Sequence, residues 1–130
     1  MYIRFAIHRK DEDSGRSLGI FHAAMDLRDF GDIEPWERDL LFELRDWFND
    51  NLEKPDRFTA SKPPYYRKQP KAISWFKGTA VEHIRRARQM VDVLESHGVA
   101  VDTYMTDRVG YVVYEDEIQI VAEAFSDLDC

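Results

Sequence analysis

The strongest constraint on the fold is a run of apolar residues that recur at steps of three and four between residues 34 and 53. They are Trp36, Leu40, Leu41, Leu44, Trp47, Phe48 and Leu52. The opposite positions hold the carboxylates Asp39, Glu43, Asp46 and Asp50. A period of about 3.6 residues is that of an amphipathic α-helix, which turns one face to a core and the other to water. The segment therefore predicts a long helix that starts near Pro35, because proline is well tolerated in a first turn.

The same period predicts two more helices, over residues 16–30 and 72–97. The stripe of the first holds Leu18, Phe21, Met25 and Leu27, and that of the second holds Ile73, Phe76, Ala80, Ile84, Ala87, Val91 and Leu94. Gly31 and Gly98 follow these stripes and are typical helix ends. The short link between the first helix and the 34–53 helix favours an antiparallel helical hairpin.

Both ends of the chain have the alternation of β-strands. Near the start, Ile3, Phe5 and Ile7 fall on one face of an extended segment over residues 2–8. After Gly98, branched and aromatic stretches are separated by short polar turns, which is typical of antiparallel strands. Three strands are expected there, over residues 99–106, 111–114 and 118–124.

The order of these elements predicts a single α+β domain over residues 1–130. The expected architecture is a four-stranded, mainly antiparallel sheet with three helices packed on one face. One strand comes from the N-terminus and pairs with a strand of a C-terminal three-strand meander. The uncovered face of this sheet could serve a homodimer, with Tyr104, Tyr111, Val113 and Ile120 as the expected contact residues.

Composition excludes several classes of protein. Apolar residues make up 44% of the 130, which is enough for a core and argues against a disordered chain. The one cysteine, Cys130, allows no internal disulfide, so the sequence points to the cytoplasm. No segment has the roughly 18 apolar residues that a membrane span needs, and the N-terminal apolar run is too short for a signal peptide.

Charge is divided unevenly along the chain. The net charge is −7 in total, and it is −7 over residues 26–53, +8 over residues 54–88 and −9 over residues 89–130. This segregation has two interpretations. The basic and acidic surfaces either neutralise each other and meet water, or one of them meets a partner of opposite charge.

The basic block contains a long proline-rich loop over residues 53–71, where cations alternate with aromatic rings. Long loops inside compact domains are usually functional or disordered. Cations suit phosphates and aromatic rings suit bases, so this loop predicts a site for an anionic ligand, a nucleic acid or an acidic partner. The expected contact residues are Arg57, Lys62, Tyr65, Tyr66, Arg67, Lys68, Lys71, Trp75 and Arg85.

Trp75 and Phe76 are neighbours, so only one of them can lie on the apolar stripe of a helix over 72–97. An exposed Trp75 would add contact area beside the basic loop, because aromatic residues and arginines dominate interface energetics. A Trp75 packed beneath the loop would belong to the core instead. The sequence leaves both placements open.

Two other patterns give alternative functions. The carboxylates of the 34–53 helix and of residues 115–129 could imitate a phosphate backbone and occupy the basic groove of another protein, as an adaptor or inhibitor does. His22, Asp26 and His83 could converge as metal ligands or as an acid–base set of a small hydrolase. No HExxH or CxxC spacing supports that metal site.

The favoured hypothesis is a non-enzymatic binding module that acts through the loop over residues 57–71. It requires no cofactor, and its partner is a nucleic acid, another anionic ligand or a protein. The adaptor or inhibitor is the second hypothesis, and the metal-dependent hydrolase is the third.

Overall fold

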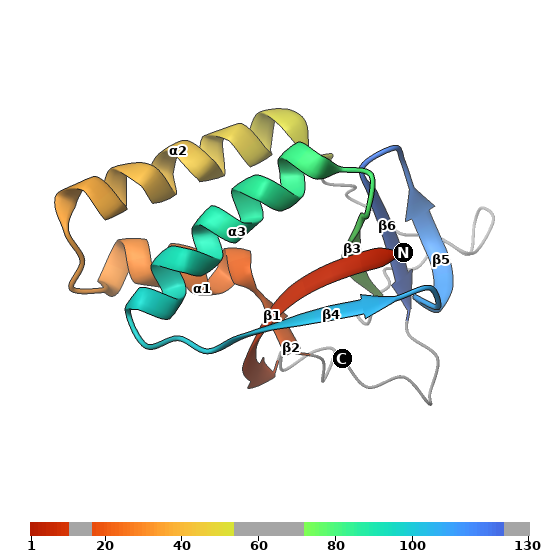
Figure 1. Ribbon diagram of the computed structural model, residues 1–130, viewed down its shortest axis with the longest axis horizontal. Helices are drawn as coiled ribbons and strands as arrows, with labels where there is room; N and C mark the ends of the chain where they lie inside the picture. The colour runs from red at the N-terminus through yellow and green to blue at the C-terminus, as the bar shows by residue number, and fades with distance from the viewer. Residues whose placement is uncertain (11–16, 54–71, 124–130) are drawn as a thin grey trace, which may run out of the picture.

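A computed structural model describes residues 1–10, 17–53 and 72–123 of the chain. It confirms an α+β fold with three helices and an antiparallel sheet. The helices are α1 (Ile20–Phe30), α2 (Pro35–Asn51) and α3 (Val81–Ser96). They lie together on one side of the first strand, as Figure 1 shows.

The sheet has six strands within the described ranges rather than the expected four. They are β1 (Tyr2–Lys10), β2 (Ser17–Gly19), β3 (Ala72–Lys77), β4 (Val101–Thr106), β5 (Tyr111–Glu115) and β6 (Gln119–Glu123). Five follow the path β2-β1-β3-β6-β5, β4 pairs with β1, and every pairing is antiparallel. The two additional strands are β2 and β3, which both come from segments whose spacing predicted helix.

Strand β3 corrects the prediction of one helix over residues 72–97. Ile73 and Phe76 fit a helical stripe, but Ile73 and Trp75 also alternate as in a strand, and β3 extends from Ala72 to Lys77 between β1 and β6. The chain then turns at Gly78, whose amide donates to the carbonyl of Met1 at 3.0 Å. A Cβ at Gly78 would lie only 3.2 Å from that oxygen, so glycine permits this close approach.

The expected C-terminal meander is only half correct. Strands β5 and β6 form a hairpin, but β4 pairs with β1 along Tyr2–Ile7, at the other edge of the sheet. Residues 107–110 connect these two edges directly, so the sheet curls and brings the end of β4 toward β5 (Figure 1). The predicted pairing of the first strand with a C-terminal strand is therefore correct, and β4 is its partner.

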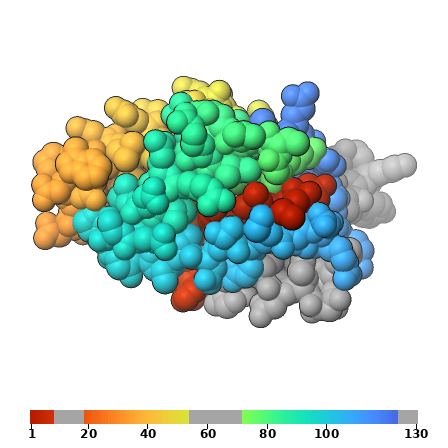
Figure 2. All heavy atoms as spheres, in the orientation of Figure 1, coloured from red at the N-terminus to blue at the C-terminus, as the bar shows by residue number. Residues whose placement is uncertain are grey.

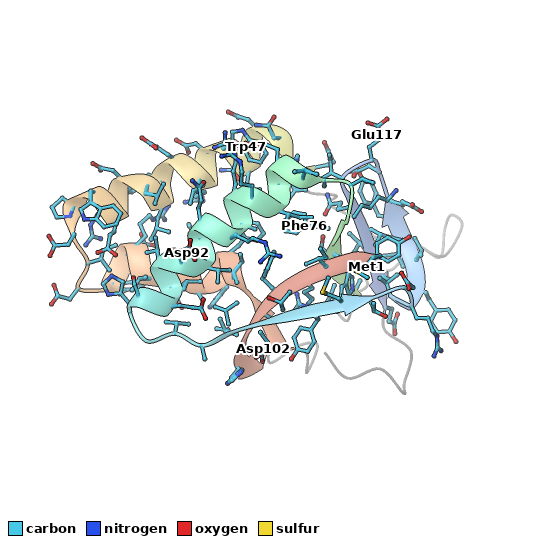
Figure 3. All side chains as sticks on the ribbon, in the orientation of Figure 1. Met1, Trp47, Phe76, Asp92, Asp102 and Glu117 are labelled. Carbon is cyan, nitrogen blue, oxygen red and sulfur yellow. The ribbon has the colours of Figure 1, made fainter. Side chains whose placement is uncertain are left out.

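Two apolar clusters lie on opposite faces of this curled sheet. The larger cluster joins the three helices to Ile3, Phe5 and Ile7 of β1 and to Phe76 of β3. Figure 3 shows Phe76 pointing from β3 toward α3. The smaller cluster fills the other face and consists of Ile73, Trp75, Val109, Ile120 and Ala122, with Tyr2 and Tyr104 packed against it. The second face of the sheet is thus a core of its own.

The ends of the helices follow their sequence signals except at the starts of α3, which β3 displaces, and of α1. Helix α3 stops where Gly98 adopts a φ of +81°, a left-handed conformation that glycine reaches at little cost. Helix α2 starts at Pro35, as expected. Helix α1 starts at Ile20 and not near residue 16, because Ser17–Gly19 pair with β1 instead.

Candidate functional site

Most of the predicted anion site lies outside the described residues. This holds for Arg57, Lys62, Tyr65, Tyr66, Arg67, Lys68 and Lys71. The two predicted contact residues that the structure describes are Trp75 and Arg85, and their surroundings differ sharply.

Trp75 lies in the core of the sheet and is only 1% exposed. As strand side chains alternate, Trp75 and Phe76 point to opposite faces, and each face has its own apolar cluster. Both neighbours are therefore buried. The indole N–H of Trp75 has no hydrogen-bond acceptor in the part of the chain that the structure describes. This placement is the second of the two that the sequence left open, and it gives Trp75 no exposed ring to offer a partner.

Arg85 is exposed on α3, but its charge is neutralised locally. Its guanidinium donates to both carboxylate oxygens of Glu82, at 2.7 and 3.2 Å, and Nε of Arg86 donates to the same carboxylate at 2.9 Å. The hydrogen bond from Arg85, together with both positive charges, lowers the pKa of Glu82. Lys77 is held in the same way by Glu115, at 2.6 Å. These cations of residues 54–88 are thus paired with carboxylates of the same chain.

The carboxylates on the outer face of α2 have a different environment. Asp39, Glu43, Asp46 and Asp50 are all exposed, and no ion pair or hydrogen bond joins them to another described residue. At 100° per residue they fall within about 60° of the helix circumference, and they extend over about 16 Å of its length. We call these four residues the acidic row.

Two exposed aromatic side chains border the acidic row. Trp36 at the start of α2 is 64% exposed. Phe42, which follows Asp39 by three residues on the same helix, is 47% exposed. The guanidinium of Arg28 lies 4.5 Å from the centre of the Phe42 ring, which holds that ring against α1. Exposed aromatic rings with a polar rim occur at many contact surfaces between proteins.

The N-terminus of α2 is fixed to the C-terminus of α3 by Glu37. One of its carboxylate oxygens accepts from the amide of Glu34 at 2.9 Å, and the other lies 2.8 Å from Nε2 of His97. The backbone hydrogen bond from Glu34 and the contact with His97 lower the pKa of Glu37, although its burial acts in the opposite direction. This contact joins the start of α2 to the end of α3.

A groove of about 330 Å³ lies between α1 and α2, on the side of α2 away from the acidic row. Its apolar lining consists of Phe21, Met25, Phe48 and Leu52. Its polar lining consists of His22 and Asp26 on α1 and of Arg45 and Asn49 on α2. Nε2 of His22 lies 3.3 Å from an oxygen of Asp26.

The proposed hydrolase set does not come together. His83 is buried on α3, where Nε2 contacts the carbonyl of Asn51 at 2.7 Å and the ring packs 4.6 Å from that of Trp47. His22 and Asp26 face the groove between α1 and α2, and Phe48 stands between them and His83. Over residues 1–10, 17–53 and 72–123, no group of three or more His, Cys, Asp or Glu side chains is placed to hold a metal ion.

The residues expected at a homodimer face are scattered by the curl of the sheet. Ile120 is 3% exposed in the smaller core, Tyr104 packs against the same core, and Tyr111 is exposed on β5. Val113 is half-buried. These four residues therefore form no continuous open face.

Sequence reasoning missed the groove and the role of its polar residues. Phe21, Met25, Phe48 and Leu52 read as ordinary core positions in the two helical stripes. The signal was present in the flanking pairs, since His22 and Asp26 are four residues apart on one helix, and Arg45 and Asn49 are four apart on the other. Only the antiparallel packing of α1 and α2 shows that the two pairs face one space.

Comparisons with known proteins name no relative: no family model, curated protein or solved structure matches this chain. Among the described helices, none is long and apolar enough to cross a membrane.

Proposed function

We propose that this chain is a non-enzymatic binding module that holds a basic protein partner against the outer face of α2, as an adaptor or inhibitor. The observation that carries this proposal is the acidic row, which consists of Asp39, Glu43, Asp46 and Asp50, with the exposed rings of Trp36 and Phe42 at its borders.

Unpaired charges of one sign in a row favour a partner of the opposite sign. They raise the rate of encounter with a basic surface and help to set its orientation, whereas the aromatic rings supply buried area once contact is made. A line of carboxylates about one helical turn apart also resembles a phosphate backbone in its charge. A basic groove that binds nucleic acid is therefore the expected kind of surface on the partner.

The alternative of anion binding through residues 57–71 remains a prediction from the sequence. Of the described cations of residues 54–88, Lys77 is paired with Glu115, Arg85 and Arg86 are paired with Glu82, and Arg88 lies over the ring of Phe5. A second anion would have to compete with these carboxylates and with a net charge of −7. For this reason we place anion binding second. A homodimer through the sheet is likewise a prediction from the sequence alone.

The test is capture of protein from a nuclease-treated cell lysate by the immobilised chain and by two charge-reversed variants. The first variant carries Asp39→Lys and Glu43→Lys in the acidic row. The matched control carries Glu95→Lys and Glu117→Lys, which reverse two exposed carboxylates outside α2 and outside the groove that Trp36 lines with α3. We expect a specific protein to be retained by the native chain and the control but lost by the acidic-row variant. Equal loss from both variants would show a general charge effect and contradict the proposal.

The same experiment separates the anion-binding alternative. An untreated lysate is passed over the native chain and over an Arg67→Glu, Lys68→Glu variant. If the retained material is nucleic acid that nuclease removes, and this variant fails to retain it, anion binding replaces our proposal. Circular dichroism confirms that each variant is folded.

A further inference from the structure

The groove between α1 and α2 has the size and the lining of a small-molecule site. Its volume of about 330 Å³ falls within the roughly 300–1,000 Å³ of ligand pockets. Such sites combine apolar walls with a few convergent polar groups, and this groove has four of each.

The apolar lining is anchored in the core. The rings of Phe21 and Phe48 meet edge to face with their centres 4.8 Å apart, and Phe48 is itself buried. Phe48 also contacts Trp47 and packs close to Phe76 and His83, so four ring contacts hold it in place. An apolar ligand body would therefore meet a preformed aromatic wall, with Met25 beside it as an adaptable side chain.

The polar lining differs between the two helices. On α1, the carboxylate of Asp26 is already in contact with His22. On α2, Arg45 is exposed, and although its charge helps to lower the pKa of Asp29, it forms no ion pair or hydrogen bond with any residue that the structure describes. The guanidinium of Arg45 is therefore the charge that is open to a ligand, and the planar fork of arginine matches a carboxylate in two parallel hydrogen bonds.

The charge around the groove restricts the ligand further. Residues 26–53 carry a net charge of −7, so a dianion such as a phosphate monoester would be repelled from this part of the molecule. A single carboxylate on an apolar body has less charge to bring in and more area to bury. We propose that the groove binds a small carboxylate with an aryl or alkyl body, whose carboxylate pairs with Arg45 and whose body packs on Phe21 and Phe48.

The test follows the amide signals of the ¹⁵N-labelled chain by NMR during titration with three matched probes. They are 4-phenylbutyrate, neutral 4-phenylbutan-1-ol and cationic 4-phenylbutylamine. We expect saturable shifts of the groove residues with the carboxylate, and an affinity roughly tenfold weaker for the alcohol and the amine.

Two variants test whether Arg45 binds the carboxylate, and a third tests whether the ligand lies in the groove. Arg45→Gln should weaken binding of 4-phenylbutyrate roughly tenfold and leave the alcohol unchanged. Arg85→Gln removes the same charge from α3, outside the groove, and should change neither. Met25→Trp should fill the groove and weaken binding of both probes.

Three results would overturn the proposal. The first is the absence of saturable shifts with 4-phenylbutyrate. The second is tightest binding of the amine, which would assign the groove to cations at Asp26. The third is an equal loss of affinity in Arg45→Gln and Arg85→Gln, which would show that only the net charge matters.

Discussion

Helices α2 and α3 are nearly equal in length, at 17 and 16 residues, and both turn an apolar face to the same core, yet their outer faces differ. Arg85 and Arg86 of α3 share the carboxylate of Glu82, three and four residues before them. The acidic row of α2 has no such neighbours of opposite charge. Figure 2 shows α3 on the front of the molecule, with β1 and β4 beside it.

The difference teaches that an excess of one charge in a sequence block does not by itself mark a binding surface. The +8 of residues 54–88 and the −7 of residues 26–53 look equivalent along the chain. On α3, Arg85 and Arg86 meet a carboxylate within one turn, whereas the carboxylates of the acidic row on α2 meet no cation among the described residues. The position of the counter-charge decides which surface is open to a partner.

The inner faces of the two helices should respond alike, and the largest expected effect tests this. Leu44 of α2 and Leu94 of α3 are both fully buried in the larger core. Truncation of either to alanine removes apolar contacts and leaves a cavity, so each should lower the free energy of unfolding by about 2–5 kcal/mol. Urea unfolding followed by circular dichroism measures both. A large loss for one helix and almost none for the other would show that the two do not share one core.

The contact between Glu37 and His97 should make the joint between α2 and α3 sensitive to acid. The pKa of Glu37 is lowered in the folded chain, so its contribution to stability is present above the carboxyl's ordinary value of 4.5 and is lost as the pH falls through the lower, folded value. Glu37→Gln should flatten the decline in the urea midpoint below pH 4.5. Glu43→Gln, on the acidic row, is the matched control and should leave that decline in place.

Arg86 gives a smaller effect that separates packing from charge on α3. Its guanidinium lies 4.4 Å from the centre of the Trp47 ring and also bonds to Glu82. Arg86→Ala should cost about 1 kcal/mol of unfolding free energy, since it removes a cation–π contact and an ion pair. Arg85→Ala removes only the ion pair and should cost less. Equal losses would show that the contact with Trp47 adds nothing.

Glu82→Gln should change stability least, and it tests directly whether Glu82 neutralises the charges of Arg85 and Arg86. Glu82→Gln leaves Arg85 and Arg86 without their shared carboxylate. Retention of the chain on immobilised heparin, a polyanion, should then increase at low salt and fall back as salt is raised. If Glu82→Gln and the native chain elute at the same salt concentration, the pairing of these arginines does not control access to their charge.

Sequence reasoning identified correctly those elements whose apolar spacing fits only one kind of secondary structure. The stripe from Trp36 to Leu52 fits only a helix, and α2 follows it. Residues 72–77 fit two interpretations, because Ile73 and Phe76 are three apart while Ile73 and Trp75 alternate. Residues 72–77 form a strand because β1 and β6 each supply an edge with which β3 pairs. Local spacing carries no information about such edges.

Sequence spacing predicted features of the candidate site only where the residues involved lie on the same helix. The exposed carboxylates of the 34–53 helix were identified from their helical spacing. Pairing of Glu82 with Arg85 and Arg86 is equally local and could have been read from the same rule. The contact of Glu37 with His97 and the groove between α1 and α2 depend on how the helices pack. They could not be derived from spacing along the chain.

Strand β1 has a consequence for how the chain folds. Its partners β3 and β4 begin about 70 and 100 residues after it, and only the short β2 is nearby in sequence. During synthesis, the backbone groups of β1 that pair with β4 must therefore remain unmatched until β4 has left the ribosome. Closing loops of this length before any pairing contact forms is slow, and the waiting strand is open to mispairing. We expect the helical hairpin of α1 and α2 to form first, and the sheet to close around β1 as the late step of folding.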